Sequence, residues 1–118
     1  MRIGIIEDDA LLAGVLRGML ESLGHAVAAV AHGYEEALAL VGGGTCDAAF
    51  IDIRLGGQPV GIEIARRGAS NGVAVVVMTG APLLPDDLAG AALLLKPFSV
   101  EAVRGVLHSL GAGRAARA

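Results

Sequence analysis

VAVVVM, residues 73–78, is the most strand-like run of the chain, because branched side chains favour extended backbone on a packed surface. Ser70-Asn71-Gly72 come before it and Thr79-Gly80 after it, and such clusters of small polar residues and glycine are typical of strand boundaries. The run is apolar throughout, without alternation of apolar and polar positions. It therefore predicts a strand covered on both faces, as in a parallel sheet between two layers of helices.

Similar apolar runs lie on both sides of this one. Four of them predict further strands: RIGII (2–6), HAVAAVA (25–31), DAAFID (47–52) and ALLL (92–95). Apolar residues at helical spacing predict helices over 9–24 and 99–110, and residues 34–41 are expected to form a short helix. Pro59 predicts the start of a further helix, over 59–68, because proline is favoured in the first turn. Strand and helix alternate along the chain, which predicts an α/β fold: a parallel sheet with right-handed crossovers and helices on both faces.

The connection between the last two strands is short and contains Pro82, Pro85 and Gly90, which disfavour a regular helix. The fourth helix of the alternating pattern is therefore predicted to be short or irregular. Asp9 and Ser99, in contrast, are predicted to be the N-caps of the helices that follow the first and the fifth strand, because their side chains can accept hydrogen bonds from a helix N-terminus.

Length, composition and charge restrict the class of protein. The 118 residues suffice for one domain, expected over 1–110, and GAGRAARA (111–118) is expected to be a flexible tail. The net charge of −3 argues against a nucleic-acid surface. No run is long enough for a membrane span or resembles a signal peptide, and Cys46, the single cysteine, is expected to be a packed thiol. Together these features predict a cytoplasmic protein.

Polar side chains follow the predicted strands at their carboxyl ends. They are Glu7, Asp8 and Asp9 after the first strand, Asp52 at the end of the third, Thr79 after the fourth, and Lys96, the only lysine, after the fifth. In a parallel sheet these ends meet at one edge, where carboxylates repel one another unless a cation lies among them. Mg²⁺ binds carboxylates while sharing a phosphate oxygen, so the pattern predicts a Mg²⁺-assisted phosphoryl site, with Lys96 balancing the remaining charge.

Four segments occur at these strand ends: IGIIEDDALL (3–12), FIDIRL (50–55), VVVMTGA (75–81) and LLLKPFS (93–99). In this order and at this spacing they resemble the signature segments of a response regulator receiver domain of the CheY-like type. The resemblance extends over residues 2–110. It implies a (βα)5 flavodoxin-like fold with strand order 2-1-3-4-5 and a function in two-component signal transduction.

The resemblance implies a phosphorylation site at Asp52. This residue matches the phosphoacceptor, which attacks phosphorus in line and becomes an aspartyl phosphate. Asp8 and Asp52 would ligate Mg²⁺ together with the backbone carbonyl of Arg54, and Glu7 would bind the ion through a water molecule. The donor would be a histidine kinase or a histidine phosphotransferase, and the signal would leave through a downstream protein or by phosphorelay. Apart from phosphoryl transfer to and from its own Asp52, the chain would not be an enzyme.

The resemblance also covers the other half of the site. Thr79 matches the residue whose hydroxyl bonds a phosphoryl oxygen, Gly80 follows it in the same loop, and Lys96 matches the lysine that contacts another phosphoryl oxygen. Pro97 follows Lys96, and in the family the corresponding Lys-Pro peptide bond is usually cis. Leu93 stands where the family usually has tyrosine or phenylalanine as a switch residue. Thr79-Gly80 without this aromatic residue is similar to a variant group of single-domain receivers with a Thr-Gly motif.

Other classes of protein fit less well. A haloacid-dehalogenase-type phosphatase would need a second aspartate two residues after Asp52, where Arg54 stands. A flavin or dinucleotide module would need a glycine-rich or hydroxyl-rich loop after the first strand, where three acidic residues stand. The alternative that remains is a pseudo-receiver, an interaction module that is not phosphorylated. Because only eight residues follow position 110, a stand-alone receiver without an output domain is expected.

Overall fold

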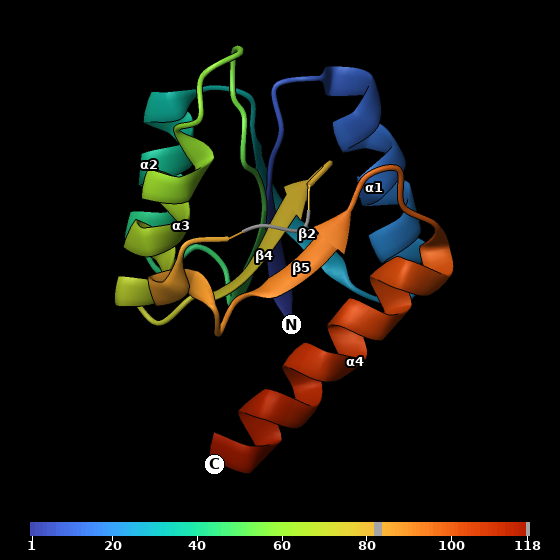
Figure 1. Ribbon diagram of the computed structural model, residues 1–118. Helices are drawn as coiled ribbons and strands as arrows, with labels where there is room; N and C mark the ends of the chain where they lie inside the picture. The colour runs from blue at the N-terminus through green and yellow to red at the C-terminus, as the bar shows by residue number, and fades with distance from the viewer. Residues whose placement is uncertain (82–83, 118) are drawn as a thin grey trace.

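A parallel β-sheet forms the centre of the molecule (Figure 1). The computed structural model describes residues 1–81 and 84–117, with no side chains described beyond Gly111. Within these residues, five strands pair in the order β2-β1-β3-β4-β5. They are β1 (Arg2–Ile6), β2 (Ala26–Ala31), β3 (Ala48–Asp52), β4 (Ala74–Thr79) and β5 (Ala92–Leu95). Each neighbouring pair is parallel, and the predicted strand order is confirmed.

Two pairs of α-helices enclose the sheet, one pair on each face: α1 (Ala10–Ser22) with α4 (Val100–Arg117), and α2 (Tyr34–Gly42) with α3 (Gly61–Ser70) (Figure 1). Leu16 of α1 and Val103 of α4 belong to an apolar core that includes Phe50 of β3. Val41 of α2 and Ile64 of α3 belong to a second core on the other face. This arrangement confirms the predicted α/β fold of the flavodoxin-like type.

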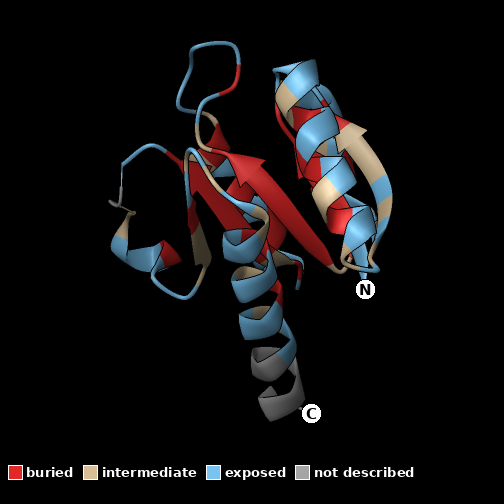
Figure 2. Cartoon of the chain, turned by 90° about the vertical axis from the view of Figure 1, so that its right-hand side faces the viewer, coloured by how far each residue is buried: buried red, intermediate tan, exposed pale blue. Residues whose placement is uncertain are grey.

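The central strand β3 is buried along its whole length (Figure 2). Ala49 and Ile51 belong to the core with α2 and α3, whereas Phe50 belongs to the core with α1 and α4. Because helices cover both faces, the strand carries apolar side chains on both, and its sequence does not alternate between apolar and polar residues. Asp52 breaks this pattern at the carboxyl end of the strand, where the apolar layers stop.

The first helix begins at the predicted cap. The Asp9 carboxylate accepts hydrogen bonds from the backbone N–H groups of Leu11 (3.0 Å) and Leu12 (3.2 Å), as an N-cap does. In contrast, α3 begins at Gly61, later than the start predicted from Pro59. The reason is that the residues after β3 form a separate tight turn, so the chain enters the helix only after this turn is complete.

The connection between β4 and β5 contains, within its described residues, a single turn of 3-10 helix, η1 (Asp86–Leu88). The prediction of a short or irregular helix is confirmed, although Pro82, which contributed to it, lies outside the described residues. Leu88 is buried in the core beside α3, and Arg66 of α3 donates hydrogen bonds of 2.7 and 3.2 Å to the Asp87 carboxylate. An apolar contact and a bidentate ion pair therefore hold this turn against α3.

Cys46 lies in the core, where it is 5% exposed, as predicted for a packed thiol. The backbone of α4 continues to Arg117. Since the side chains of 112–118 lie outside the described residues, the flexible tail expected over 111–118 stays a prediction. Among the helices that the structure describes, none combines the length and the apolar character that crossing a membrane requires.

Candidate functional site

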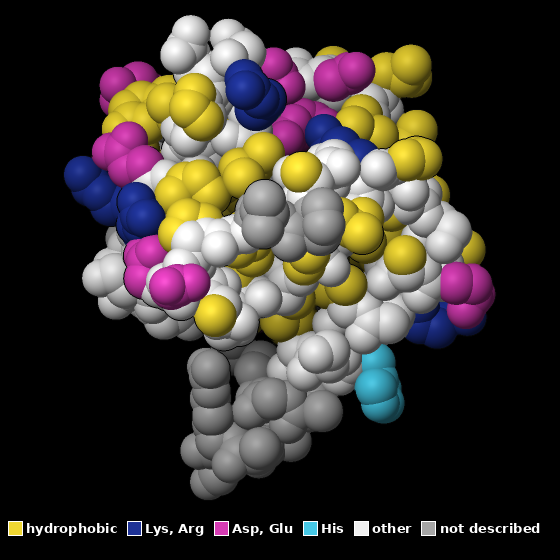
Figure 3. Space-filling view, viewed as in Figure 1, with side chains coloured by type: hydrophobic (Ala, Val, Ile, Leu, Met, Phe, Trp, Pro, Cys, Tyr) yellow, Lys and Arg dark blue, Asp and Glu magenta, His cyan; other side chains and the backbone are white. Residues whose placement is uncertain are grey.

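The predicted site residues meet at the carboxyl edge of the sheet, which is the upper edge in Figure 1. Sheet hydrogen bonds continue one residue beyond three of the strands: Glu7 N–H donates to Ala31 O (3.0 Å), Ile53 N–H to Met78 O (3.1 Å) and Lys96 N–H to Thr79 O (2.8 Å). These bonds fix the backbone that carries the acidic and cationic side chains. In Figure 3, acidic and basic side chains gather along this edge.

Lys96 lies between two carboxylates. Its Nζ donates hydrogen bonds to Glu7 Oε1 and to Asp52 Oδ2, each at 3.0 Å. Burial by itself lowers the pKa of Lys96, but the hydrogen bonds to Asp52 and Glu7 outweigh it, so the pKa is raised above its ordinary value. A compact ammonium with three donor protons can serve two separate carboxylates, whereas the planar fork of arginine is suited to one bidentate partner. This geometry explains a lysine in a chain whose other cations are arginines.

Glu7 is the most deeply buried charged residue of the cluster. Its side chain is 1% exposed, and its Oε2 has no hydrogen-bond partner among the described residues. Burial, followed by a hydrogen bond with Asp52, raises the pKa of Glu7 from 4.5 to about 8, although Lys96 opposes this change. A buried oxygen without a partner is costly, so Oε2 marks a position where a water molecule or a cation would be stabilising.

Three carboxylates converge at this edge of the sheet. One carboxylate oxygen from each of Glu7, Asp8 and Asp52 lies within 4.8 Å of the other two. Oxygen ligands at this spacing, with the partnerless Glu7 Oε2 beside them, fit a hard divalent cation such as Mg²⁺. The cluster can therefore hold the metal ion that the sequence predicts.

The backbone after β3 contacts two of these carboxylates. Arg54 N–H donates to Asp52 Oδ1 at 3.2 Å, and Gly56 N–H donates to Asp8 Oδ2 at 2.9 Å. Asp8 is exposed on the surface of the cluster, and the hydrogen bond from Gly56 is the main cause that lowers the pKa of Asp8 below its ordinary value. Both aspartates are thus engaged through one oxygen each by the same stretch of backbone.

The remaining predicted residues frame the other side of the site. Thr79 is 5% exposed, and its Oγ1 accepts a hydrogen bond from Ala81 N–H at 3.2 Å. Among the described residues, no hydrogen bond joins the Thr79 hydroxyl to the acidic cluster. Gly80 is exposed, and the Lys96–Pro97 peptide bond is cis, the conformation that the resemblance implies. Leu93, which stands where the family usually has an aromatic switch residue, is half-buried on β5.

Two of the unpredicted contacts at the site involve residues outside the predicted set. One is the hydrogen bond from Gly56 to Asp8, and the other joins His32 Nδ1 to the backbone oxygen of Glu7 at 3.0 Å. A carbonyl oxygen only accepts, so Nδ1 is the protonated nitrogen of His32. The Gly-Gly pair at 56–57 is a sequence signal for a tight turn. For His32 the sequence holds no comparable signal, because its partner is a backbone atom of another strand end.

In protein stripped of divalent metal, the free energy of unfolding is expected to fall as the pH rises from about 5 to about 8. Folded Glu7 keeps its proton up to about pH 8, whereas an unfolded chain releases it near 4.5. The unfolded state then binds fewer protons in this window, so raising the pH favours unfolding. The raised pKa of Glu7 corresponds to a loss of at most about 5 kcal/mol in the free energy of unfolding across this window. Urea unfolding at several pH values, in the presence of a chelator, measures it.

The matched variant for this prediction is Glu7→Gln, which cannot ionise and should flatten the profile between pH 5 and 8. The lowered pKa of Asp8 acts with the opposite sign, but below its ordinary value of 3.8 and therefore outside this window. An unchanged slope in Glu7→Gln would show that another group causes the dependence.

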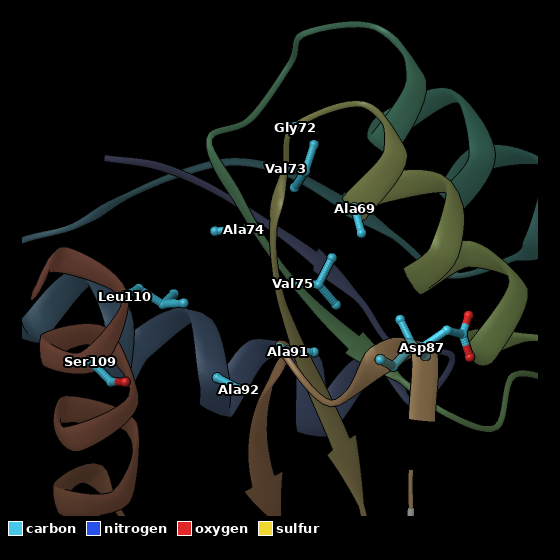
Figure 4. Close-up of a pocket in the computed structure, with 12 residues that line it drawn as sticks. Ala69, Gly72, Val73, Ala74, Val75, Asp87, Ala91, Ala92, Ser109 and Leu110 are labelled. Atoms are coloured by element: carbon cyan, nitrogen blue, oxygen red, sulfur yellow. The ribbon is translucent and has the colours of Figure 1, made fainter. Parts of the chain in front are cut away.

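A cavity of about 440 Å³ lies at the opposite edge of the sheet, near the amino ends of β4 and β5 (Figure 4). Apolar residues and glycines form most of its wall, and Asp87 is the one charged residue among those that line it. Asp87 is paired with Arg66. The cavity is therefore remote from the convergent carboxylates and carries no cluster of reactive groups, so the candidate site is the carboxyl edge.

Comparison with solved structures finds close likenesses of the whole chain. The response regulator PhyR from Brucella abortus is 31% identical over 98% of this chain, with a TM-score of 0.81, and this chain spans 51% of its length. SdrG from Pseudomonas melonis Fr1, in its BeF3-activated conformation, is 30% identical over 92% of this chain and 94% of its own, with a TM-score of 0.77.

A third structure, a CheY-like receiver domain protein from Methanospirillum hungatei JF-1, shares the fold, with a TM-score of 0.83 at 22% identity over 99% of this chain and 98% of its own. No curated protein matches the sequence. The family model of the response regulator receiver domain matches residues 3–107, which include all the strand-end residues of the site. The chain belongs to the response regulator receiver domain family.

Proposed function

We propose that this chain is a phosphoacceptor receiver, in which Asp52 accepts a phosphoryl group from a histidine kinase or a histidine phosphotransferase. The observation that carries the proposal is the position of the Lys96 ammonium, 3.0 Å from Asp52 and 3.0 Å from Glu7 in a cluster of three carboxylates. Phosphoryl transfer spreads negative charge over the transferred oxygens, so an ammonium and a cation-binding cluster beside the acceptor supply the stabilisation that this reaction needs.

The transfer step exchanges one bond to phosphorus for another. A carboxylate oxygen of Asp52 attacks phosphorus in line, a P–O bond forms, and the P–N bond to the donor histidine breaks with its electron pair on nitrogen. Asp8, Asp52 and the backbone carbonyl of Arg54 would hold Mg²⁺ directly, and Glu7 would hold it through a water molecule. When bound, Mg²⁺ neutralises charge on the phosphoryl oxygens.

Lys96 and Thr79 would receive the transferred group. Two of the three ammonium protons of Lys96 are engaged by carboxylates, and the third is left for a phosphoryl oxygen. The Thr79 hydroxyl accepts from Ala81 N–H, so its own proton stays available for a second phosphoryl oxygen. Among the residues that the structure describes, none has an atom within 4 Å of a Cβ added at Gly80, which follows Thr79 in the same loop.

Three of the similar structures support a signalling output through protein contact. PhyR from Brucella abortus is named a response regulator, PhyR from Bartonella quintana is named an anti-anti-sigma factor, and SdrG has a BeF3-activated conformation. By analogy, we infer that the phosphorylated form of this chain binds a downstream protein. Leucine at position 93 has neither a ring nor a hydroxyl, so an aromatic switch at this position is not the route.

Incubation with a small phosphodonor and Mg²⁺ is expected to add one phosphoryl group, seen by intact mass, with the acid-stable and base-labile behaviour of an acyl phosphate. Asp52→Asn should remain unlabelled, because an amide is a poor nucleophile, and a chelator should prevent labelling of the unsubstituted protein. Asp9→Asn is the matched control: it makes the same change nearby, and asparagine caps a helix as well as aspartate does. Equal labelling of Asp52→Asn would refute the acceptor, and absence of any labelling would favour the pseudo-receiver.

A further inference from the structure

The segment after Asp52 folds into a miniature β-hairpin that projects beyond the carboxyl edge of the sheet (Figure 1). Leu55 and Gln58 exchange two backbone hydrogen bonds, with N···O distances of 2.9 and 3.0 Å. Gly56 and Gly57 form the turn with φ of +57° and +77°. A two-residue hairpin turn of this kind needs left-handed backbone at both central positions, which favours glycine or asparagine and excludes branched side chains.

In the first arm of this hairpin, alternate backbone N–H groups point toward the acidic cluster. Arg54 N–H donates to Asp52 Oδ1 at 3.2 Å, and Gly56 N–H donates to Asp8 Oδ2 at 2.9 Å. Leu55, between them, directs its N–H away from the cluster, to Gln58 O. Successive N–H groups of extended backbone point to opposite sides, so the pairing of Leu55 with Gln58 also determines where its two neighbours point.

This arrangement holds together two side chains that repel each other. Asp8 comes from the end of β1 and Asp52 from the end of β3, and like charges this close favour separation. A hydrogen bond from N–H to a carboxylate is charge-assisted, and each carboxylate uses only one oxygen for it. The second oxygen of each aspartate is left for other partners, which for Asp52 Oδ2 include Lys96.

We propose that the Gly56-Gly57 turn is a positioning element of the metal site. It aims the backbone N–H groups of Arg54 and Gly56 at the two aspartates and so presets their orientation before Mg²⁺ binds. The inference rests on the proposed function, since it takes the acidic cluster as the place where Mg²⁺ is held. Contacts that orient metal ligands from behind change metal affinity about 10- to 100-fold when they are lost. The turn is therefore expected to contribute at least about tenfold to Mg²⁺ affinity.

Gly56→Val tests this dependence, because a branched residue cannot adopt the left-handed turn. Mg²⁺ is titrated and followed by the amide NMR shifts of the cluster, without any phosphodonor, and its affinity should fall about tenfold or more. Gly56→Asn, which tolerates left-handed backbone, should recover most of it. Gly44→Val is the matched control: Gly44 has a φ of +69° and equally open surroundings, but it precedes β3 and lies at the opposite edge of the sheet. Its Mg²⁺ affinity should stay unchanged.

The titration distinguishes failure of the positioning function from failure of the proposed function. If the unsubstituted protein binds Mg²⁺ and Gly56→Val binds it equally well or better, the positioning function is wrong while the proposed function stands. If the unsubstituted protein binds no Mg²⁺, both are wrong. Should Gly56→Val fail to fold, Gly56→Ala replaces it, because alanine strains the turn less, and an intermediate loss of affinity is then expected. The same loss in Gly44→Val would show a general effect of strain and overturn the proposal.

Discussion

Replacing Lys96 by methionine is expected to lower the free energy of unfolding at neutral pH by about 3 kcal/mol. Methionine keeps a flexible stem of similar length but removes the cation that lies 3.0 Å from both Glu7 and Asp52. The side chains of these two residues are 1% and 9% exposed, so they would remain as buried acids without a positive partner. Removing one member of a buried ion pair typically costs 3–5 kcal/mol, and the 27% exposure of Lys96 favours the lower end. Urea unfolding measures the change.

Two further variants make this prediction specific. Arg17→Met removes the same charge from an exposed pair, Arg17 with Glu21 at 3.6 Å on α1, and should cost no more than about 0.5 kcal/mol. Adding Asp52→Asn to Lys96→Met should recover much of the loss, because it removes the buried carboxylate that Lys96 contacts at 3.0 Å, whereas Glu7 already keeps its proton at neutral pH. If Lys96→Met unfolds as easily as Arg17→Met, the ion pairs of Lys96 do not stabilise the fold.

The positions of the strand-end side chains could be predicted because a parallel sheet brings the carboxyl ends of its strands to one edge. Asp52 and Lys96 each follow an apolar run, AAFI and ALLL, and a charged group in such a place needs a partner. That they would be partners of each other, at 3.0 Å, follows from strand order, since β3 and β5 are both neighbours of β4. The sequence therefore predicted which residues form the cluster, but not which hydrogen bonds join them.

The contacts of backbone atoms could not be predicted in the same way. A Gly-Gly pair at 56–57 indicates a tight turn, but the direction of its N–H groups depends on where Asp8 lies in space. The predicted start of α3 was wrong for the same reason. Pro59 favours a helix start locally, but the hairpin at 55–58 comes directly before it, and the helix begins only at Gly61. Local patterns identify elements, whereas tertiary packing places their ends.

Gly61→Ala is expected to destabilise the protein by about 3 kcal/mol and to impair phosphorylation of Asp52. Gly61 is the first residue of α3, and its N–H donates to Ile53 O at 3.0 Å. A Cβ added there would lie 2.0 Å from the carbonyl oxygen of Asp52 and 2.5 Å from the Cα of Ile53. These are backbone atoms of the acceptor strand, so the clash cannot be relieved by turning a side chain. Relief requires that α3 or the end of β3 move, and the second movement displaces the acceptor.

The matched control is Gly14→Ala, an identical substitution in the interior of α1. A Cβ at Gly14 would meet no atom within 4 Å, so alanine should raise the free energy of unfolding by about 0.5–1 kcal/mol through its better helix propensity. Urea unfolding and intact-mass labelling with a phosphodonor, applied to both variants, give opposite signs for stability and a labelling defect for Gly61→Ala alone. A Gly61→Ala protein as stable as Gly14→Ala would contradict the close approach of α3 to the acceptor backbone. Normal labelling with reduced stability would show that α3, and not the end of β3, moves to relieve the clash.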